Sequence, residues 1–472
     1  MNSGDVIGGI ALMSMAFTVV LVLLRHRVYR RRVFYNPKQS CVLGMAGPAI
    51  ETISIHCGKN GFVLPGPLTG AVSGLFEIEV RATITGWLWD PAVNIKAGEF
   101  DDVQYLERGG HGVRVFNVSR LLNSKVAGEQ VKLTGLGLTW PSTETRLHVC
   151  REKVAAEDRV LVVAPHPDDA EIAAFGLYAD TRATVVTLTA GDASDRYHNP
   201  MQPWMSLSRN TIASMRVWDS LTIPQFAGVL PGGAINLCLP DGRLRDMYLH
   251  PNRDFRGEGK EALDFSTLRQ MNRSPLLQKN APCNWRSLVH DLGHIIANAK
   301  PTIVVAPHPR LDPHPDHLFA TLALVEALQS ADSMTARMFL YTVHNRRSEL
   351  WPFGPAGSGV ALLPIFPDDG VCASGFYSHR LSIERQRQKF VALEAMHDVR
   401  DMQWPIEPRH QRVGSRIAAE FRAWAHGMGH KPTSYLRRAV RPDELFFVTS
   451  LEVSAALAHA AAEQNAAVRV AA

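Results

Sequence analysis

The sequence has few cysteines for its length, and none of them are paired in a motif. Its 472 residues include six cysteines, and no two of them form a Cys-x-x-Cys pair. The six are Cys41, Cys57, Cys150, Cys238, Cys283 and Cys372. Scattered cysteines weigh against a disulfide framework and favour free thiols in a reducing compartment. The composition is otherwise that of a globular protein, and the length allows two or more domains.

An excess of positive charge is missing from most of the chain. The formal net charge is +5, but a cluster of five arginines near the N-terminus, opposed only by Asp5, accounts for most of it and leaves about +1. The five are Arg25, Arg27, Arg30, Arg31 and Arg32. The body is therefore not a basic nucleic-acid-binding protein by composition, and no nucleic-acid partner is expected. No protein partner can be inferred either.

Charge is absent altogether from residues 6–24, VIGGIALMSMAFTVVLVLL. As a helix this run would span roughly 28 Å, close to the thickness of a bilayer core. The arginines follow the run, whereas a signal peptide carries positive charge before it. The positive-inside rule places the basic end in the cytoplasm. We therefore expect residues 1–33 to be a transmembrane anchor with a basic flank, in a single-pass membrane protein whose body lies on the cytoplasmic face. A buried core helix is the less favoured alternative.

Short alternating runs separated by turn residues fill residues 34–155. In FEIEVRATI, residues 76–84, apolar and polar side chains alternate with the period of a half-buried strand. GVRVFNV and VKLTGLGLTW are similar. Several such runs predict an antiparallel, β-sandwich-like accessory domain. Trp87 and Trp89 would share one strand face, where packing is favoured over stacking on a sugar ring.

Apolar strands alternate with helix-length segments in residues 156–450. The strand candidates are VLVVA, ATVVTLT, INLCLP, TIVVA and RMFLYTV. This rhythm predicts an α/β fold with a Rossmann-like, mostly parallel sheet and helices on both faces. In such folds ligands bind beyond the carboxyl ends of the strands. The polar residues 243–284 are either a lid over the site or a variable insertion, and residues 451–472 form an Ala-rich tail.

Two clusters of histidine and aspartate follow two of these strands. They are VLVVAPHPDDAEI, residues 160–172, and TIVVAPHPRLDPHPDHLFA, residues 302–320. The ends of two parallel strands can bring such side chains to one point. A catalytic zinc ion takes about three protein ligands through nitrogen or oxygen, and the flanking prolines stiffen the backbone that holds them. The pair of clusters therefore favours a metal site over two ordinary strand-ending turns.

PHPDDAE followed by HPDH resembles the PIG-L or LmbE-like family of zinc-dependent de-N-acetylases, which act on N-acetylglucosamine conjugates. TLTAGD, LPDGRL, RQKFVALEAMHD and ELFFV resemble further family segments and appear in the same order along the chain. The resemblance covers about residues 159–449 and leaves out the N-terminal segments. It implies an amide hydrolase acting on carbon–nitrogen bonds other than peptide bonds. The implied cofactor is Zn²⁺ or another divalent metal, and the implied substrate is an N-acetylated amino sugar.

The resemblance also assigns roles to residues of the two clusters. The implied metal ligands are His166, Asp169 and His317. Asp168 becomes the general base for a zinc-bound water that attacks the amide carbonyl. His314 stabilises the oxyanion or protonates the leaving amine, and Asp316 holds and tunes His314.

The chain departs from the family pattern after the second strand of the α/β region. The family commonly has an arginine followed three residues later by a glutamate, but here Arg209 is followed by Ile212. Arg209 remains a candidate substrate contact, whereas His308 and His397 are expected to be structural. The expected anchor favours a lipid-linked sugar or a glycan precursor built on a lipid. The alternatives are a zinc hydrolase of another amide or ester, and a membrane-tethered glycan-binding protein.

Overall fold

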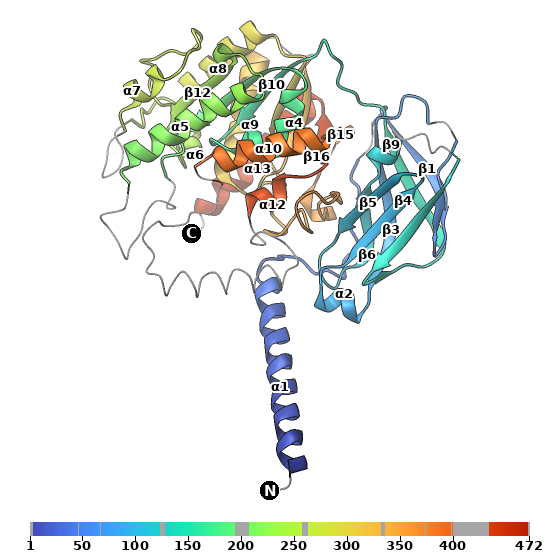
Figure 1. Ribbon diagram of the computed structural model, residues 1–472. Helices are drawn as coiled ribbons and strands as arrows, with labels where there is room; N and C mark the ends of the chain where they lie inside the picture. The colour runs from blue at the N-terminus through green and yellow to red at the C-terminus, as the bar shows by residue number, and fades with distance from the viewer. Residues whose placement is uncertain are drawn as a thin grey trace.

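The structure of the chain is a computed structural model (Figure 1). The residues that it describes are 3–45, 47–66, 68–122, 128–193, 207–256, 263–331, 336–371, 373–397, 399 and 434–470. The five cysteines among them are buried and free, and Cys372 lies outside the described residues.

The described part of residues 50–150, which we call the β domain, forms two antiparallel sheets. One sheet has the strand order β1-β9-β3-β6 with β8 beside β3, and the other has the order β2-β7-β4-β5. The strands are β1 Ile50–Cys57, β2 Gly61–Val63, β3 Ser73–Ala82, β4 Ala92–Ala97, β5 Phe100–Tyr105, β6 His111–Asn117, β7 Gln130–Leu136, β8 Leu138–Thr139 and β9 Thr143–Cys150. Two short helices, α2 Ile84–Leu88 and α3 Ser119–Leu122, lie between them.

The strand β3 ends two residues earlier than its alternating pattern predicts. Thr83 caps α2 instead, because its side chain accepts a hydrogen bond from the backbone N–H of Gly86. Ile84 is consequently exposed at the start of α2 rather than inside the sheet. Trp87 lies in α2 and Trp89 follows its last residue, so the two indoles do not share a strand face.

A third sheet, of seven described strands, carries the two histidine clusters. Its order is β12-β11-β10-β13-β14-β16-β15. The strands are β10 Arg159–Ala164, β11 Arg182–Thr189, β12 Ala234–Leu239, β13 Ile303–Pro307, β14 Arg337–Tyr341, β15 Gly375–Arg380 and β16 Asp443–Thr449. The run from β12 to β14 is parallel, whereas β16 pairs antiparallel with both β14 and β15.

Helices cover both faces of this sheet because successive strand side chains point to opposite sides. On β10, Leu161 and Val163 pack into the core that α8 and α9 share, while Val160 and Val162 pack with α4. The helices are α4 Asp169–Ala179, α5 Arg209–Phe226, α6 Leu244–Leu249, α7 Phe265–Gln270, α8 Trp285–Ala299, α9 Pro315–Ser330, α10 Ile383–Ala395, α12 Tyr435–Ala439 and α13 Leu451–Val470, with 3-10 turns at η3 Pro231–Gly233 and η4 Pro367–Asp369. Figure 1 shows α4, α5 and α10 grouped on the side of the sheet that faces the viewer.

The described part of residues 243–284 is packed core rather than a separate lid. Leu244 and Met247 of α6 and Leu268 of α7 are almost completely buried in the same core as α8 and α9. Residues 257–262 of this segment lie outside the described residues.

The predicted membrane anchor is corrected by the structure. Among the described residues, no helix combines the length and the apolar character needed to cross a membrane. The helix α1, Ser3–Arg30, continues through the arginine cluster, and its last turns contact protein. The ring of His26 stacks on Trp87 with centroids 4.0 Å apart, and the hydroxyl of Tyr29 accepts a hydrogen bond from the backbone N–H of Arg108. The predictions of a transmembrane segment at residues 6–24 and of single-pass membrane localisation are therefore wrong.

The predicted fold class is corrected as well. It named a membrane anchor helix ahead of the globular domains, and it gave the α/β class to a chain in which antiparallel pairing is extensive. Both sheets of the β domain are antiparallel, and so is the β14-β16-β15 side of the large sheet. The described chain is thus only partly α/β.

A buried ion pair holds a kink in α4, the helix that follows the first cluster. The backbone of Ala174 leaves the helical region with φ −139° and ψ 17°, which breaks the regular hydrogen bonds around it. Lys389 Nζ donates to the carbonyl of Ile172 at 2.9 Å and contacts Glu444 Oε1 at 2.7 Å. The Glu444 carboxylate in turn accepts from the backbone N–H groups of two residues in the next turn, Gly176 and Leu177. The pair therefore satisfies the groups that the kink exposes.

Replacing Lys389 with Met should destabilise the protein strongly. Lys389 and Glu444 are both almost fully buried, so the substitution leaves a buried carboxylate without its cation. We expect the free energy of unfolding in a urea titration to fall by about 3–5 kcal/mol. Arg387→Met on the same helix is the matched control, because the Arg387–Glu384 pair is exposed and worth less than about 1 kcal/mol. Equal losses in the two variants would contradict this account of the kink.

Candidate metal centre

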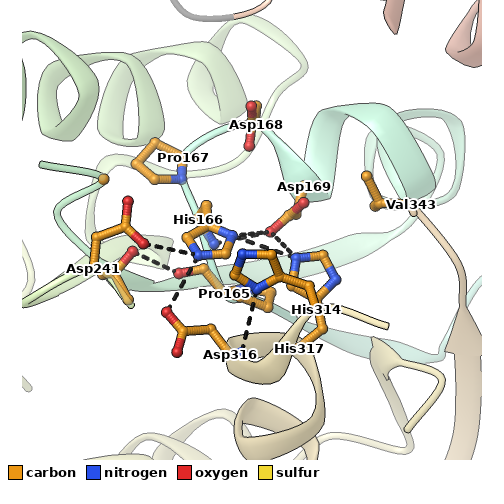
Figure 2. Close-up of polar contacts among 12 residues, drawn as sticks. Pro165, His166, Pro167, Asp168, Asp169, Asp241, His314, Asp316, His317 and Val343 are labelled. Carbon is orange, nitrogen blue, oxygen red and sulfur yellow. Dashed lines mark hydrogen bonds and ion pairs between the residues drawn. The ribbon is translucent and has the colours of Figure 1, made fainter. Parts of the chain in front are cut away.

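The two clusters meet at one edge of the large sheet because β10 and β13 are parallel neighbours. Val160 pairs with Ile303 and Val162 with Val305, so the segments that follow β10 and β13 leave the sheet at the same end. The segment after β10 continues through His166 into α4, and the segment after β13 continues through a short turn into α9. Figure 2 shows the side chains of both segments gathered in one group of contacts.

Three side-chain atoms form a nearly equilateral triangle in this group. The distance from His166 Nδ1 to Asp169 Oδ2 is 3.1 Å, from His317 Nε2 to Asp169 Oδ2 3.2 Å, and from His317 Nε2 to His166 Nδ1 3.3 Å. Tetrahedral ligands at zinc distances of about 2.0–2.1 Å are separated by roughly 3.3–3.4 Å. All three residues are buried. The donor set and its spacing therefore fit a zinc ion, and these are the three residues that the sequence pattern indicates as ligands.

Carboxylates contact the outer nitrogen of each imidazole in the triangle. His317 Nδ1 lies 2.9 Å from Asp312 Oδ2, although the two are not aligned as a hydrogen bond. His166 Nε2 lies 3.1 Å from Asp241 Oδ1 and 3.4 Å from Asp316 Oδ2. Metal-binding histidines characteristically have such partners, which orient the ring and raise its basicity.

The carboxylates around the triangle create an environment that favours a bound cation. Burial alone would lower the pKa of His317, but Asp169 and Asp312 outweigh it and raise that pKa to about 10. Burial opposes charge on His166 too, yet Asp241 and the other carboxylates hold its pKa well above the usual range. In the absence of metal, the carboxylates thus keep protons on both imidazoles. A divalent cation would take the place of those protons, since ligation requires neutral histidines.

Asp168 occupies a strained position between the two ligands of the first cluster. Its φ is 153°, in a region that residues other than glycine rarely adopt. Such strain costs about 1–3 kcal/mol and tends to occur at functional sites. Asp168 Oδ2 lies 3.5 Å from Arg216 Nη2, and Figure 2 shows its carboxylate standing apart from the dashed contacts around His166.

The second cluster brings His314 to the triangle but directs Asp316 elsewhere. The His314 ring lies 4.8 Å from that of His166 and 5.0 Å from that of His317 between centroids. The Asp316 carboxylate accepts from the backbone N–H groups of Gly242 at 2.7 Å and Leu244 at 3.2 Å. Asp316 contacts His314 through its backbone, whose N–H donates to His314 Nδ1 at 3.2 Å. Its side chain therefore positions His166 and the 241–244 turn rather than His314.

Arg209 lies one step away from the triangle. Its guanidinium pairs with Asp192, whose other carboxylate oxygen accepts from the backbone N–H of Asp241 at 2.9 Å. His308 and His397 make structural contacts, as the sequence predicts. His308 Nδ1 accepts from the backbone N–H groups of the second and third residues after it, and His397 Nδ1 contacts the Asp219 carboxylate.

Sequence reasoning missed four side chains of the site, which are Asp241, Asp312, Arg216 and His344. Asp241 belongs to the LPDGRL segment and Asp312 to the second cluster. Both therefore lie in recognisable motifs, but the sequence assigned them no role. His344 follows β14 at the same edge of the sheet as the triangle, and its ring centroid lies 5.1 Å from that of His317. Arg216, in the middle of α5, had no local signal. Its side chain donates to the carbonyl of Gly191 at 2.9 Å.

The region that contains both clusters matches a known family. Residues 161–328 match the family model described as PIG-L, GlcNAc-PI de-N-acetylase. This region belongs to the PIG-L family. Membership supports a hydrolase of the metal-dependent de-N-acetylase type in general terms, acting on GlcNAc-type substrates. It agrees with the His and Asp groups that could hold a metal ion.

The solved structures that resemble this chain are distant. One is GalB, the 4-carboxy-2-hydroxymuconate hydratase from Pseudomonas putida KT2440. It is 12% identical, with 62% of this chain and 95% of that chain covered and a TM-score of 0.31. Another is a family two carbohydrate esterase from Cellvibrio japonicus, at 11% identity, 63% and 90% coverage and a TM-score of 0.16. At these TM-scores the likeness says nothing about the activity of this chain. No curated protein matches it.

Replacing Asp312 with Asn should weaken metal binding without abolishing it. Asp312 Oδ2 contacts His317 and accepts from the backbone N–H groups of Val343 and His344, while Oδ1 accepts from the backbone N–H of His314. An amide cannot accept at both oxygen positions. We expect the Kd for zinc to rise about 10- to 100-fold in competition with a chromophoric chelator. Asp246→Asn, on the outer part of α6, is the control and should leave the Kd unchanged. An unaltered Kd in the Asp312 variant would remove Asp312 from the site.

Proposed function

We propose that this PIG-L protein hydrolyses the N-acetyl group of an N-acetylglucosamine-type sugar and releases acetate and a free amine. The observation that supports it best is the triangle of His166, Asp169 and His317 atoms, with the His314 ring beside it and Asp168 next to Asp169 in the chain. Two imidazoles and one carboxylate leave a zinc ion a further position for water or substrate, as catalytic zinc sites do. A site of this type suits the hydrolysis of an amide.

A zinc ion held by the three ligands supplies Lewis-acid chemistry, because it polarises a carbonyl and lowers the pKa of bound water towards about 7. Asp169 would bind through the oxygen that already faces both imidazoles. The carboxylates of Asp241, Asp312 and Asp316 hold those imidazoles in orientation. Another divalent metal would fit the same nitrogen and oxygen donors.

Asp168 would accept the proton of the attacking water. It lies next to the candidate ligand Asp169 in the chain and two residues after His166. Arg216 lies beside the Asp168 carboxylate and contacts the carbonyls of Pro167 and Gly191, which fixes the guanidinium. A general base must reach its proton within a hydrogen-bond distance, and such contacts often tighten only when substrate is bound.

His314 would stabilise the negative charge that develops on the carbonyl oxygen. Its Nδ1 accepts the backbone N–H of Asp316, which in the neutral ring leaves the proton on Nε2 as a donor. Burial and the neighbouring His166 and His317 lower the pKa of His314, so the ring is neutral. A neutral imidazole can donate a hydrogen bond to an oxyanion. The leaving amine would take from Asp168 the proton that Asp168 accepted from the water.

The proposed substrate is an N-acetylated amino sugar without a specified carrier. The expectation of a lipid-linked sugar rested on the anchor, and the structure removes that support. Arg209 stays a candidate substrate contact, because the chain of Arg209, Asp192 and Asp241 connects α5 to the edge of the metal centre.

Replacing Asp168 with Asn should remove turnover while metal binding persists. Asn is close in size and, like Asp, tolerates positive φ better than most residues, so the fold of the turn should survive. We expect acetate release from an N-acetylglucosamine substrate to fall about 10²- to 10⁴-fold with zinc content unchanged. Asp180→Asn, at the other end of α4, is the matched control and should keep wild-type turnover. Full activity in the Asp168 variant would exclude it as the base.

A further inference from the structure

A small pocket lies between the C-terminal part of α1 and the α2 region of the β domain. Its lining is unusual because it combines aromatic rings with three basic side chains. The residues are Val22, Arg25, His26, Trp87, Leu88, Trp89 and Arg108. His26 stacks on Trp87, and the Arg25 guanidinium lies over the Trp89 ring at 5.8 Å from its centroid. These contacts hold the basic groups at the pocket.

Two guanidiniums of the pocket have buried N–H groups that make no hydrogen bond within the described structure. They are Nη2 of Arg108 and Nε of Arg25. Arg108 is only 2% exposed, and its remaining contacts are with Asp90 through Nε and with the face of the Tyr29 ring. A buried donor without an acceptor destabilises the folded state, and a charged donor does so more strongly. An acceptor in the pocket would relieve this destabilisation.

The balance of charge around the pocket is positive. Arg25, Arg108 and the nearby Arg30 are opposed by Asp90, which already pairs with Arg108. Burial and the neighbouring Arg108 lower the pKa of Arg25, and Asp90 offsets them only in part. Burial, Arg30 and Arg108 likewise lower the pKa of His26. Positive charge is therefore in excess where the unmatched donors lie, which is the requirement for binding an anion.

We propose that this pocket binds a phosphate group, with Arg25 and Arg108 donating to its oxygens. Guanidinium groups match the geometry of phosphate and can donate two parallel hydrogen bonds to it. The pocket is formed by α1, α2 and the β5–β6 connection, and it shares no residue with the metal centre. The proposal does not depend on the function proposed for that centre.

The test is isothermal titration calorimetry of the full chain with glucose 6-phosphate and with glucose. We expect the phosphorylated sugar to bind and the neutral sugar not to bind. Arg25→Gln should weaken binding at least about tenfold, since it removes a charged donor. Arg27→Gln is the matched control, because Arg27 carries the same charge on the exposed side of α1 and does not line the pocket. It should bind glucose 6-phosphate like the wild type.

Three results would overturn the proposal. They are no binding of glucose 6-phosphate, equal binding of glucose, and an equal loss of glucose 6-phosphate affinity in the Arg25 and Arg27 variants. The last would mean general attraction to a basic helix. Circular dichroism checks that the Arg25 variant is folded. If it is not, Arg25→Lys serves instead, and intermediate affinity is expected because it keeps the charge with fewer donors.

Discussion

The parallel pairing of β10 with β13 is the constraint on which the candidate site depends. Both strands carry Val-Val-Ala and run into Pro-His-Pro, and their pairing makes the chain leave the sheet twice at one edge. His166 and Asp169 arrive from the first exit and His317 from the second, and their ligand atoms come within 3.1–3.3 Å of one another. Each cluster alone supplies an incomplete ligand set. The fold brings the two clusters together into one candidate metal centre. The proposed metal binding therefore depends on the sheet topology and not on either motif alone.

Residues from distant parts of the chain support the helix α4 beside the candidate centre. Neighbouring residues at the start of β16 face different partners. Glu444 reaches the kink of α4 together with Lys389, and Asp443 pairs with Arg120 of the β domain at 2.8 Å. The helix α4, which begins with the candidate ligand Asp169, is therefore braced by a strand that also contacts the β domain.

Local pattern predicted the elements around the site better than the contacts within it. The clusters that end two apolar strands predicted the positions of β10, α4, β13 and α9 in the sequence. Apolar runs and proline-flanked turns are local features, so the sequence alone reveals them. The contacts of Asp241 and Asp312 with the ligand histidines depend on which segments meet, and no local pattern encodes that. The antiparallel insertion of β16 depends on strand order in the same way. The error over residues 6–24 has another cause. The anchor prediction used only the apolar character of the run. The contact of His26 with Trp87 arises in the tertiary structure, and no local pattern predicts it.

The most direct test of the account is the anomalous diffraction of crystals grown with zinc, recorded on both sides of the zinc absorption edge. The account predicts one strong anomalous peak within about 2.0–2.2 Å of His166 Nδ1, Asp169 Oδ2 and His317 Nε2, with a position left open towards His314. A peak coordinated by other residues, or no peak at this edge of the sheet at full zinc loading, would contradict it.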